Sequence, residues 1–217
     1  MRGAGPYNTG MDPNTGDGRA GARRWNPAGD GAPPSAEIAW LARSGGIASV
    51  LDAGCGWGRH LAVFAGTART LHGFDPDEEG VAATRERLRG AAADTRAWAA
   101  TLASAEPPAA PYDVVVCYGV LHFLPRTERA DAYDRLASWT RPGGLLAIAS
   151  FNAAVPIPPD LRPLMPEPPP DSGELRTRFA DWETVRARSH VFDDEHEGGI
   201  RHTHSIDRLI VRAPGRT

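Results

Sequence analysis

The chain has 217 residues, a formal net charge of −3, 41% hydrophobic residues and 24% charged residues, a balance that fits one globular domain and excludes a collagen-like, wholly disordered or membrane-embedded chain. The sequence shows no apolar run of membrane-spanning length and no signal-peptide pattern, so we expect a cytoplasmic protein that does not act at a membrane. The small negative charge argues against nucleic acid and for a small molecule as partner. Lysine is absent, which excludes lysine Schiff bases and a Gly-Lys-Ser/Thr phosphate loop.

The N-terminal segment, residues 1–34, is rich in Gly, Pro, Asn and Asp and has neither a helical nor a strand period. We expect it to be a flexible leader, because it offers too little apolar surface to offset the entropy of ordering. From Ser35 the pattern changes to a short helix that carries Ile38 and Leu41. A single folded domain is therefore expected over residues 35–217.

Short apolar runs then alternate with amphipathic stretches. Strands are expected at residues 48–53, 71–74, 114–118 and 145–151, with helices after Gly58, Pro76 and Thr127 and a weakly marked third strand at 90–93. Repeated strand, helix, strand predicts an α/β fold with a doubly wound, mostly parallel sheet and helices on both faces. The nearly continuous apolar character of the strands is typical of strands that are covered on both sides.

The C-terminal third begins with a proline-rich segment, residues 152–173, in which no helix or central strand can persist. We expect a surface loop or lid there. A short helix at 173–179 and two strands at 184–192 and 201–212 should follow. The Gly198-Gly199 pair between these strands predicts an antiparallel hairpin that closes the sheet edge.

A glycine-rich loop follows the first strand, with glycines at every second position: Gly54, Gly56 and Gly58. Alternate glycines let a ligand lie against the backbone. Asp52 precedes the loop, and Asp75 ends the next strand, where a carboxylate can accept hydrogen bonds from both hydroxyls of a ribose. The spacing differs from the Gly-x-Gly-x-x-Gly of dinucleotide binders, which argues against a nicotinamide oxidoreductase. An adenosine compound is the predicted cofactor.

This constellation resembles the first motif and the second-strand acid of the class I S-adenosylmethionine-dependent methyltransferases. The segments 112–125 and 141–144 resemble that family's fourth strand with its following loop and the turn into its fifth strand. The resemblance implies a Rossmann-like, seven-stranded sheet and S-adenosyl-L-methionine as cofactor. It places the methionine part on the glycine loop and implies these further cofactor contacts: Asp52 to the ammonium, Asp75 to the ribose, Asp94 to the adenine amino group, and Tyr118 at the end of the fourth strand.

The C-terminal part resembles, more narrowly, the tellurite-resistance methyltransferase group. The residues that carry this resemblance are Gly173 to Arg176, Phe179, Trp182-Glu183, Glu195-His196 and Arg201. It implies that His196 and Arg201 line the pocket of the acceptor.

His122 follows the fourth strand at the edge where α/β sheets bind ligands. It could orient or deprotonate the attacking atom, or it could only cap the loop. His196, His202 and His204 cluster with acidic residues, and such a set could bind a divalent metal or the substrate. A solvated hairpin is the preferred interpretation, and no resident metal is expected.

The function that these residues predict is methyl transfer from S-adenosylmethionine to a small-molecule acceptor, with His122, His196 and Arg201 as the catalytic candidates. The alternative is an S-adenosylmethionine-binding protein, or an enzyme that uses the same scaffold without transferring a methyl group. The glycine loop does not distinguish between methyl transfer and this alternative.

Overall fold

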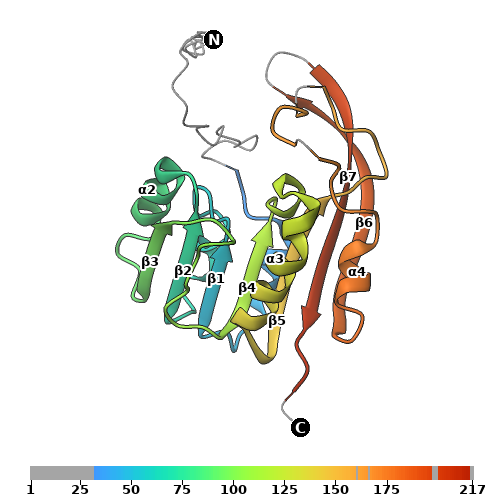
Figure 1. The fold of residues 1–217 in the computed structure, drawn as a ribbon. Helices are drawn as coiled ribbons and strands as arrows, with labels where there is room; N and C mark the ends of the chain where they lie inside the picture. Colours follow the sequence, from blue (N-terminus) through green and yellow to red (C-terminus); the bar gives the residue numbers. More distant parts are fainter. Residues whose placement is uncertain (1–31, 160, 166, 197–199, 216–217) are drawn as a thin grey trace, which may run out of the picture.

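A seven-stranded sheet organises the molecule, with the strand order β3-β2-β1-β4-β5-β7-β6 (Figure 1). The computed structural model describes residues 32–159, 161–165, 167–196 and 200–215. The strands are β1 (Ser49–Ala53), β2 (Thr70–Asp75), β3 (Asp94–Ala99), β4 (Tyr112–Tyr118), β5 (Thr140–Phe151), β6 (Glu183–His196) and β7 (Ile200–Arg212). The first five run parallel, whereas β7 is antiparallel to both β5 and β6.

Helices cover both faces of this sheet. They are α1 (Ala36–Arg43), α2 (Glu78–Arg87), α3 (Arg126–Trp139) and α4 (Glu174–Arg178), with 3-10 turns η1 (Ala62–Phe64) and η2 (Leu121–Phe123). In Figure 1, α3 and α4 lie in front of the sheet. The expected doubly wound, mostly parallel sheet with a C-terminal antiparallel pair of strands is confirmed.

Two apolar cores form because alternate strand residues point to opposite faces. Val114 and Val116 of β4 pack with Ile38 of α1, while Val115 packs with Leu136 of α3 on the other side. All five side chains are fully buried, and each contributes roughly 1.5–3 kcal/mol of hydrophobic stabilisation. The continuous apolar runs in the sequence are thus explained by helices on both sides.

Two local expectations were wrong. No α-helix follows Gly58, because the eight residues up to Gly66 form only turns and η1, with the N–H of Phe64 donating to the carbonyl of Leu61 at 3.0 Å. The third strand lies at Asp94–Ala99 and not at residues 90–93. It is an edge strand in which Ala97 is the one buried residue, so its sequence lacks the apolar run of a central strand.

The pair β6–β7 is longer than expected and extends past the rest of the sheet. β7 pairs with β5 from Ile206 to Arg212, whereas the stretch 200–205 pairs with β6 alone. This arm, residues 190–196 and 200–206, rises above the carboxyl edge of the parallel strands in Figure 1. The expected Gly198-Gly199 turn lies outside the described residues.

The expected leader, residues 1–34, also falls almost wholly outside the described part of the chain, so the boundary at residue 35 stays a prediction. Among the helices that the structure describes, none has the length and apolar character needed to cross a membrane.

Candidate cofactor and acceptor site

The carboxyl edge of the parallel strands has a switch point between β1 and β4. The chain continues from β1 to β2 on one side, while β4 lies on the other side of β1. The loops that follow β1 and β4 therefore leave in different directions, and the crevice in which open α/β sheets bind their ligands is expected at this point. The glycine loop after β1 and the segment Gly119-Val120 after β4 border this crevice.

The glycine loop is shaped for a close approach of its backbone. Gly54 has a φ of +85°, and a Cβ there would lie 2.2 Å from Cγ2 of Val120. Gly56 has a φ of +48°, and a Cβ there would meet nothing within 4 Å. Gly54 is thus required for packing within the protein, whereas the backbone of Gly56 faces open space that a ligand can occupy.

Asp75, at the end of β2, holds this loop in place. Its Oδ2 accepts a hydrogen bond from the N–H of Gly56 at 2.9 Å, and its Oδ1 accepts one from the N–H of Asp77 at 2.9 Å. Burial raises the pKa of Asp75, although these hydrogen bonds lower it in part. Because each carboxylate oxygen keeps a further lone pair, Asp75 can order the loop and still accept from ligand hydroxyls.

Asp52, in β1, is a buried carboxylate with 1% of its surface exposed. Neither of its oxygens has a hydrogen-bond partner among the described residues. Burial, and then the charge of Asp75, raise its pKa well above the usual value, while the Arg59 guanidinium lowers it. An unpartnered buried carboxylate costs stability, and a cation bound in the crevice would remove that cost.

Tyr118 ends β4 on the same face of the sheet as Asp52, because Asp52 is in register with Val116 and Tyr118 lies two residues further on. Its ring packs edge-to-face on His60, with the ring centroids 5.1 Å apart. Burial raises the pKa of Tyr118, and its hydroxyl has no hydrogen-bond partner within the described part of the chain. A second unsatisfied polar group therefore lies near the switch point.

His122, in η2, is 4% exposed and lies between the rings of Phe123 and Phe151, at centroid distances of 4.2 and 4.5 Å. Its Nδ1 accepts a hydrogen bond from the N–H of Phe151 at 3.2 Å. Burial, and then the nearby His204, lower the pKa of His122 to about 3. The ring is therefore neutral, and its proton must be on Nε2, which has no partner among the described residues. His122 is set up to donate a hydrogen bond and not to remove a proton.

Comparison with known proteins agrees with this geometry. Residues 50–144, from β1 to the start of β5, match the family described as methyltransferase domain. This region is therefore similar in sequence to methyltransferase domains. The expected resemblance to the class I S-adenosylmethionine-dependent methyltransferases, inferred from the glycine loop and Asp75, is confirmed.

Solved structures share this fold. TehB from Haemophilus influenzae superposes with a TM-score of 0.68 at 20% identity, over 82% of this chain and 61% of that one. The N-methyltransferase NodS from Bradyrhizobium japonicum WM9, in complex with S-adenosyl-L-homocysteine, gives 0.65 at 18% identity, over 82% and 84%. The [4+2]-cyclase SpnF gives 0.61 at 18% identity, over 83% and 82%. No curated protein matches the chain in sequence.

The methyltransferase domain does not place Asp94 at the crevice, which corrects its expected role at the adenine. Asp94 begins β3 opposite Thr70, whereas Asp75 is in register with Ala99. The five residue steps from Asp94 to Ala99 span about 17 Å of strand. Asp94 instead lies 3.4 Å from Nε2 of His72 at the amino edge. The misplaced third strand caused this error.

The residue that reaches the carboxyl edge after β3 is Thr101, which sequence reasoning missed. The N–H of Ala100 donates to the carbonyl of Asp75 at 3.1 Å, which places Thr101 beside the end of β2. Its Oγ1 accepts from the N–H of Ser104 at 3.2 Å. The Thr-x-x-Ser spacing was the available signal, because it is typical of a turn that starts where a strand ends.

A partly buried ion pair between Arg208 of β7 and Glu37 of α1 was also missed. Nη1 of Arg208 lies 3.1 Å from Oε2 of Glu37, while Nε of Arg208 has no partner in the described residues. Both residues contribute to the electrostatic environment of Tyr118. The signal in the sequence was an arginine directly before the apolar run 209–211 of the last strand.

The structure describes the side chain of Arg201 but not that of His196. Arg201 is exposed and stands in register with Glu195, on the face of β7 opposite to His202 and His204. That face is not the one that carries Tyr118 and Arg208. The backbone of His196 ends β6, and its side chain lies outside the described residues. Their expected joint pocket is thus not brought together by the described structure.

Proposed function

We propose that this domain transfers the methyl group of S-adenosylmethionine to a small-molecule acceptor bound at the carboxyl ends of β4 and β5. The observation that carries the proposal is the pairing of a fully buried, unpartnered Asp52 carboxylate with the open space over the Gly56 backbone. Both lie at the switch point of a methyltransferase fold.

The residues present fit this cofactor. Asp52 would accept from its ammonium, the loop from Gly54 to Gly58 would bind its methionine part, and Asp75 would accept from the ribose hydroxyls. When bound, S-adenosylmethionine supplies an electrophilic methyl group on a sulfonium centre. Because that leaving group is already activated, the protein has mainly to orient the acceptor and exclude water.

Hydrogen-bond donors lie on the side of the site where the methyl acceptor would bind. Nε2–H of His122, the hydroxyl of Tyr118 and Nε of Arg208 are all buried without a partner in the described chain. A ring whose pKa is about 3 does not serve as a base near neutral pH. These groups support an acceptor that is already an anion or a soft nucleophile, such as a thiolate, which attacks without losing a proton. His196 stays a candidate for closing this pocket, whereas Arg201 lies on the opposite face of β7.

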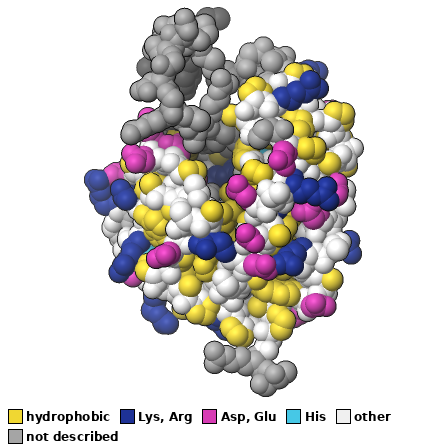
Figure 2. Space-filling model, in the orientation of Figure 1, with side chains coloured by type: hydrophobic (Ala, Val, Ile, Leu, Met, Phe, Trp, Pro, Cys, Tyr) yellow, Lys and Arg dark blue, Asp and Glu magenta, His cyan; other side chains and the backbone are white. Residues whose placement is uncertain are grey.

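The surroundings of the domain support a small molecule as its partner. Acidic and basic side chains are interspersed on the face shown in Figure 2, with no field of one sign. Cys55 and Cys117 are buried free thiols, which fits the reducing conditions of the cytoplasm. We propose a cytoplasmic enzyme that acts on neither nucleic acid nor membranes.

A second function is favoured by one comparison. SpnF, which shares the fold, is named as a [4+2]-cyclase, so this scaffold also supports chemistry of another kind. In that case the domain would bind S-adenosylmethionine without consuming it.

The deciding experiment incubates the protein with methyl-labelled S-adenosylmethionine and a panel of thiols, amines, hydroxyls and chalcogen anions. Methyl transfer predicts labelled product and S-adenosylhomocysteine in equal amounts, with the Asp52→Asn variant greatly impaired. Glu183→Gln, on β6 and ion-paired with Arg212 far from the crevice, is the matched control and should turn over normally. Tight cofactor binding without any labelled product would support the second function instead.

A further inference from the structure

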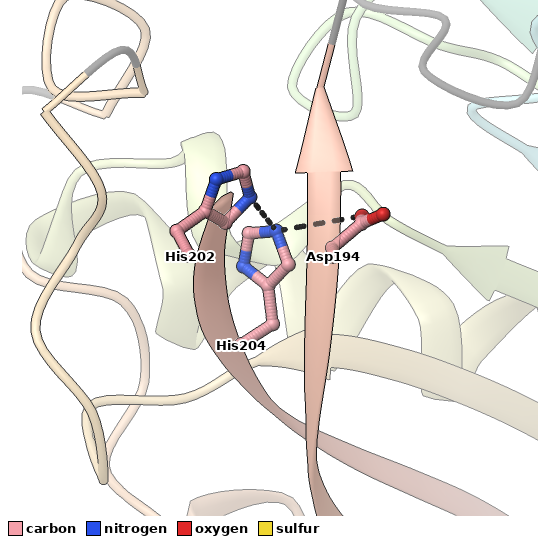
Figure 3. A group of neighbouring side chains, drawn as sticks. All are labelled: Asp194, His202 and His204. Atoms are coloured by element: carbon pink, nitrogen blue, oxygen red, sulfur yellow. Dashed lines mark hydrogen bonds and ion pairs between the residues drawn. The ribbon is translucent and has the colours of Figure 1, made fainter. Parts of the chain in front are cut away.

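Three metal-ligating side chains converge on the arm formed by β6 and β7 (Figure 3). Asp194 of β6 is directly opposite His202 of β7, and His204 lies two residues further along β7. Opposed residues of antiparallel strands share a face, as do residues i and i+2, so all three point to the same side. Their potential ligand atoms lie within 4.8 Å of one another.

We propose that Asp194, His202 and His204 form a binding site for a divalent transition-metal ion of the Zn²⁺ type. Nε2 of His202 and Nε2 of His204 are 2.8 Å apart, and Nε2 of His204 is 3.8 Å from Oδ2 of Asp194. Two nitrogens that are each about 2.0–2.1 Å from one ion lie about 2.9–3.4 Å apart. The imidazole nitrogens are thus slightly closer than neighbouring ligands, and small rotations of the His202 ring and of the half-exposed Asp194 carboxylate complete the set.

The ligand types select the ion. Two imidazoles and one carboxylate suit Zn²⁺ and its first-row neighbours, whereas Mg²⁺ and Ca²⁺ require mostly oxygen ligands. Three protein ligands leave a coordination position for water or another molecule. The site departs from the expectation of a solvated hairpin, because its central ligand is not solvated.

His204 is that central ligand, with 3% of its surface exposed. Its ring stacks on Phe151, with centroids 4.2 Å apart and planes 2° from parallel, and also contacts Phe192 at 5.4 Å. These contacts fix the ring before any ion binds, which lowers the entropy cost of binding. His204 also borders a small cavity under the proline-rich segment, together with Asn152 and Met165.

The same distances also permit a hydrogen bond from one imidazole to the other without any metal ion. An experiment must therefore distinguish the metal site from this hydrogen-bonded arrangement. Zn²⁺ is titrated calorimetrically into the untagged, metal-free full chain, and Co²⁺ is followed by its visible absorption. The proposal predicts one ion per chain, with at least tenfold weaker binding in both His202→Ala and Asp194→Asn. Asp193→Asn is the matched control, because Asp193 is the neighbour on the opposite face and bonds to Thr203 at 2.9 Å.

Thermal unfolding shows whether each variant is folded, and Asp194→Asn, half-exposed and nearly isosteric, keeps the test valid if His202→Ala unfolds. No binding by the wild-type chain would overturn the proposal in favour of the hydrogen-bonded arrangement. Binding that Asp194→Asn and His202→Ala leave unchanged would overturn it too, because the ion would then lie elsewhere. The result is independent of methyl transfer, since no methyl donor or acceptor is present.

Discussion

At the scale of a residue, Asp52 is a group that suits ligand binding but lowers the stability of the free protein. Its buried carboxylate has no partner in the described chain, and its pKa is raised by burial. A group whose pKa is raised on folding makes its full contribution to stability at a pH below its pKa in the unfolded chain. That contribution is lost as the pH rises through its pKa in the folded protein. At neutral pH, Asp52 therefore weakens the free protein.

We accordingly expect Asp52→Asn to raise the free energy of unfolding of the free protein at neutral pH by about 1–3 kcal/mol, while binding of S-adenosylmethionine becomes weaker. Denaturant unfolding at several pH values and calorimetry check the two effects. The gain in stability should shrink in acid, where the wild-type carboxyl is protonated. A variant that is less stable and binds normally would show that Asp52 has only a structural role.

Gly54 and Gly56 differ in what surrounds them, and their substitutions should separate folding from binding. A side chain at position 56 would point into open space. Gly56→Val should therefore lower the free energy of unfolding by only about 1–2 kcal/mol, because of the positive φ. It should abolish cofactor binding without unfolding the domain. Gly54→Ala places its Cβ 2.2 Å from Val120 and should destabilise the fold itself. Circular dichroism with calorimetry distinguishes them; normal binding by Gly56→Val would remove the loop from the cofactor site.

His122 is neutral and carries its proton on Nε2, so it should not produce an ionisation in the pH dependence of turnover near neutral pH. His122→Gln is expected to lower kcat about tenfold or more while leaving the shape of the pH profile unchanged. Steady-state rates from about pH 6 to pH 9 provide the test. Loss of a basic limb in the variant would instead identify His122 as the general base.

At the scale of secondary-structure elements, Asp113 joins three strands at the amino edge of the sheet. Its Oδ2 accepts from the N–H groups of Ala48 and Ser49 at 2.7 and 2.9 Å, and Oδ1 pairs with Arg141 at the start of β5. Burial raises the pKa of Asp113, but these bonds outweigh it and hold the pKa below the usual range. The contribution of Asp113 to the free energy of unfolding is therefore present at a pH above its pKa in the unfolded chain. It is lost as the pH falls through its pKa in the folded protein.

Asp113→Ala should lower the free energy of unfolding by about 1–3 kcal/mol at neutral pH, because two backbone donors lose their acceptor. The difference from the wild type should become smaller in acid. Urea unfolding near pH 7 and near pH 3 measures both, and cofactor affinity should stay unchanged because Asp113 is at the opposite edge from the glycine loop. A difference that grows in acid would contradict this sign.

At the scale of the whole molecule, the proposed cofactor site links the two halves of the sheet, because we place it at the loops after β1, β2 and β4. S-adenosylhomocysteine at about one hundred times its dissociation constant should add about 2.7 kcal/mol to the free energy of unfolding. Hydrogen exchange should slow at residues 54–58 and 119–120 and stay unchanged at the amino edge near Asp113. Protection spread evenly over the sheet would contradict a site confined to the switch point.

The sequence by itself determined the class of fold, the central strands and the position of the glycine loop, whereas the binding of ribose hydroxyls by Asp75 stays a prediction. Each of these depends on a local pattern: an apolar run that is covered on both sides, or glycines needed at a positive φ. Thr70–Asp75 and Tyr112–Tyr118 could be located within two residues for this reason. Edge strand β3 could not, since its burial is slight and its pairing with β2 decides its position.

Only the tertiary structure decided which polar groups meet. Arg208 pairs with Glu37 across 171 residues, and the N–H of Phe151 fixes the tautomer of His122. Asp194 meets His202 and His204 because of the register of β6 on β7. A one-residue change in that register would move Asp194 to the other face. Local patterns specify elements, whereas burial, tautomer and ligand geometry arise where distant segments pack together, and no single segment carries that information.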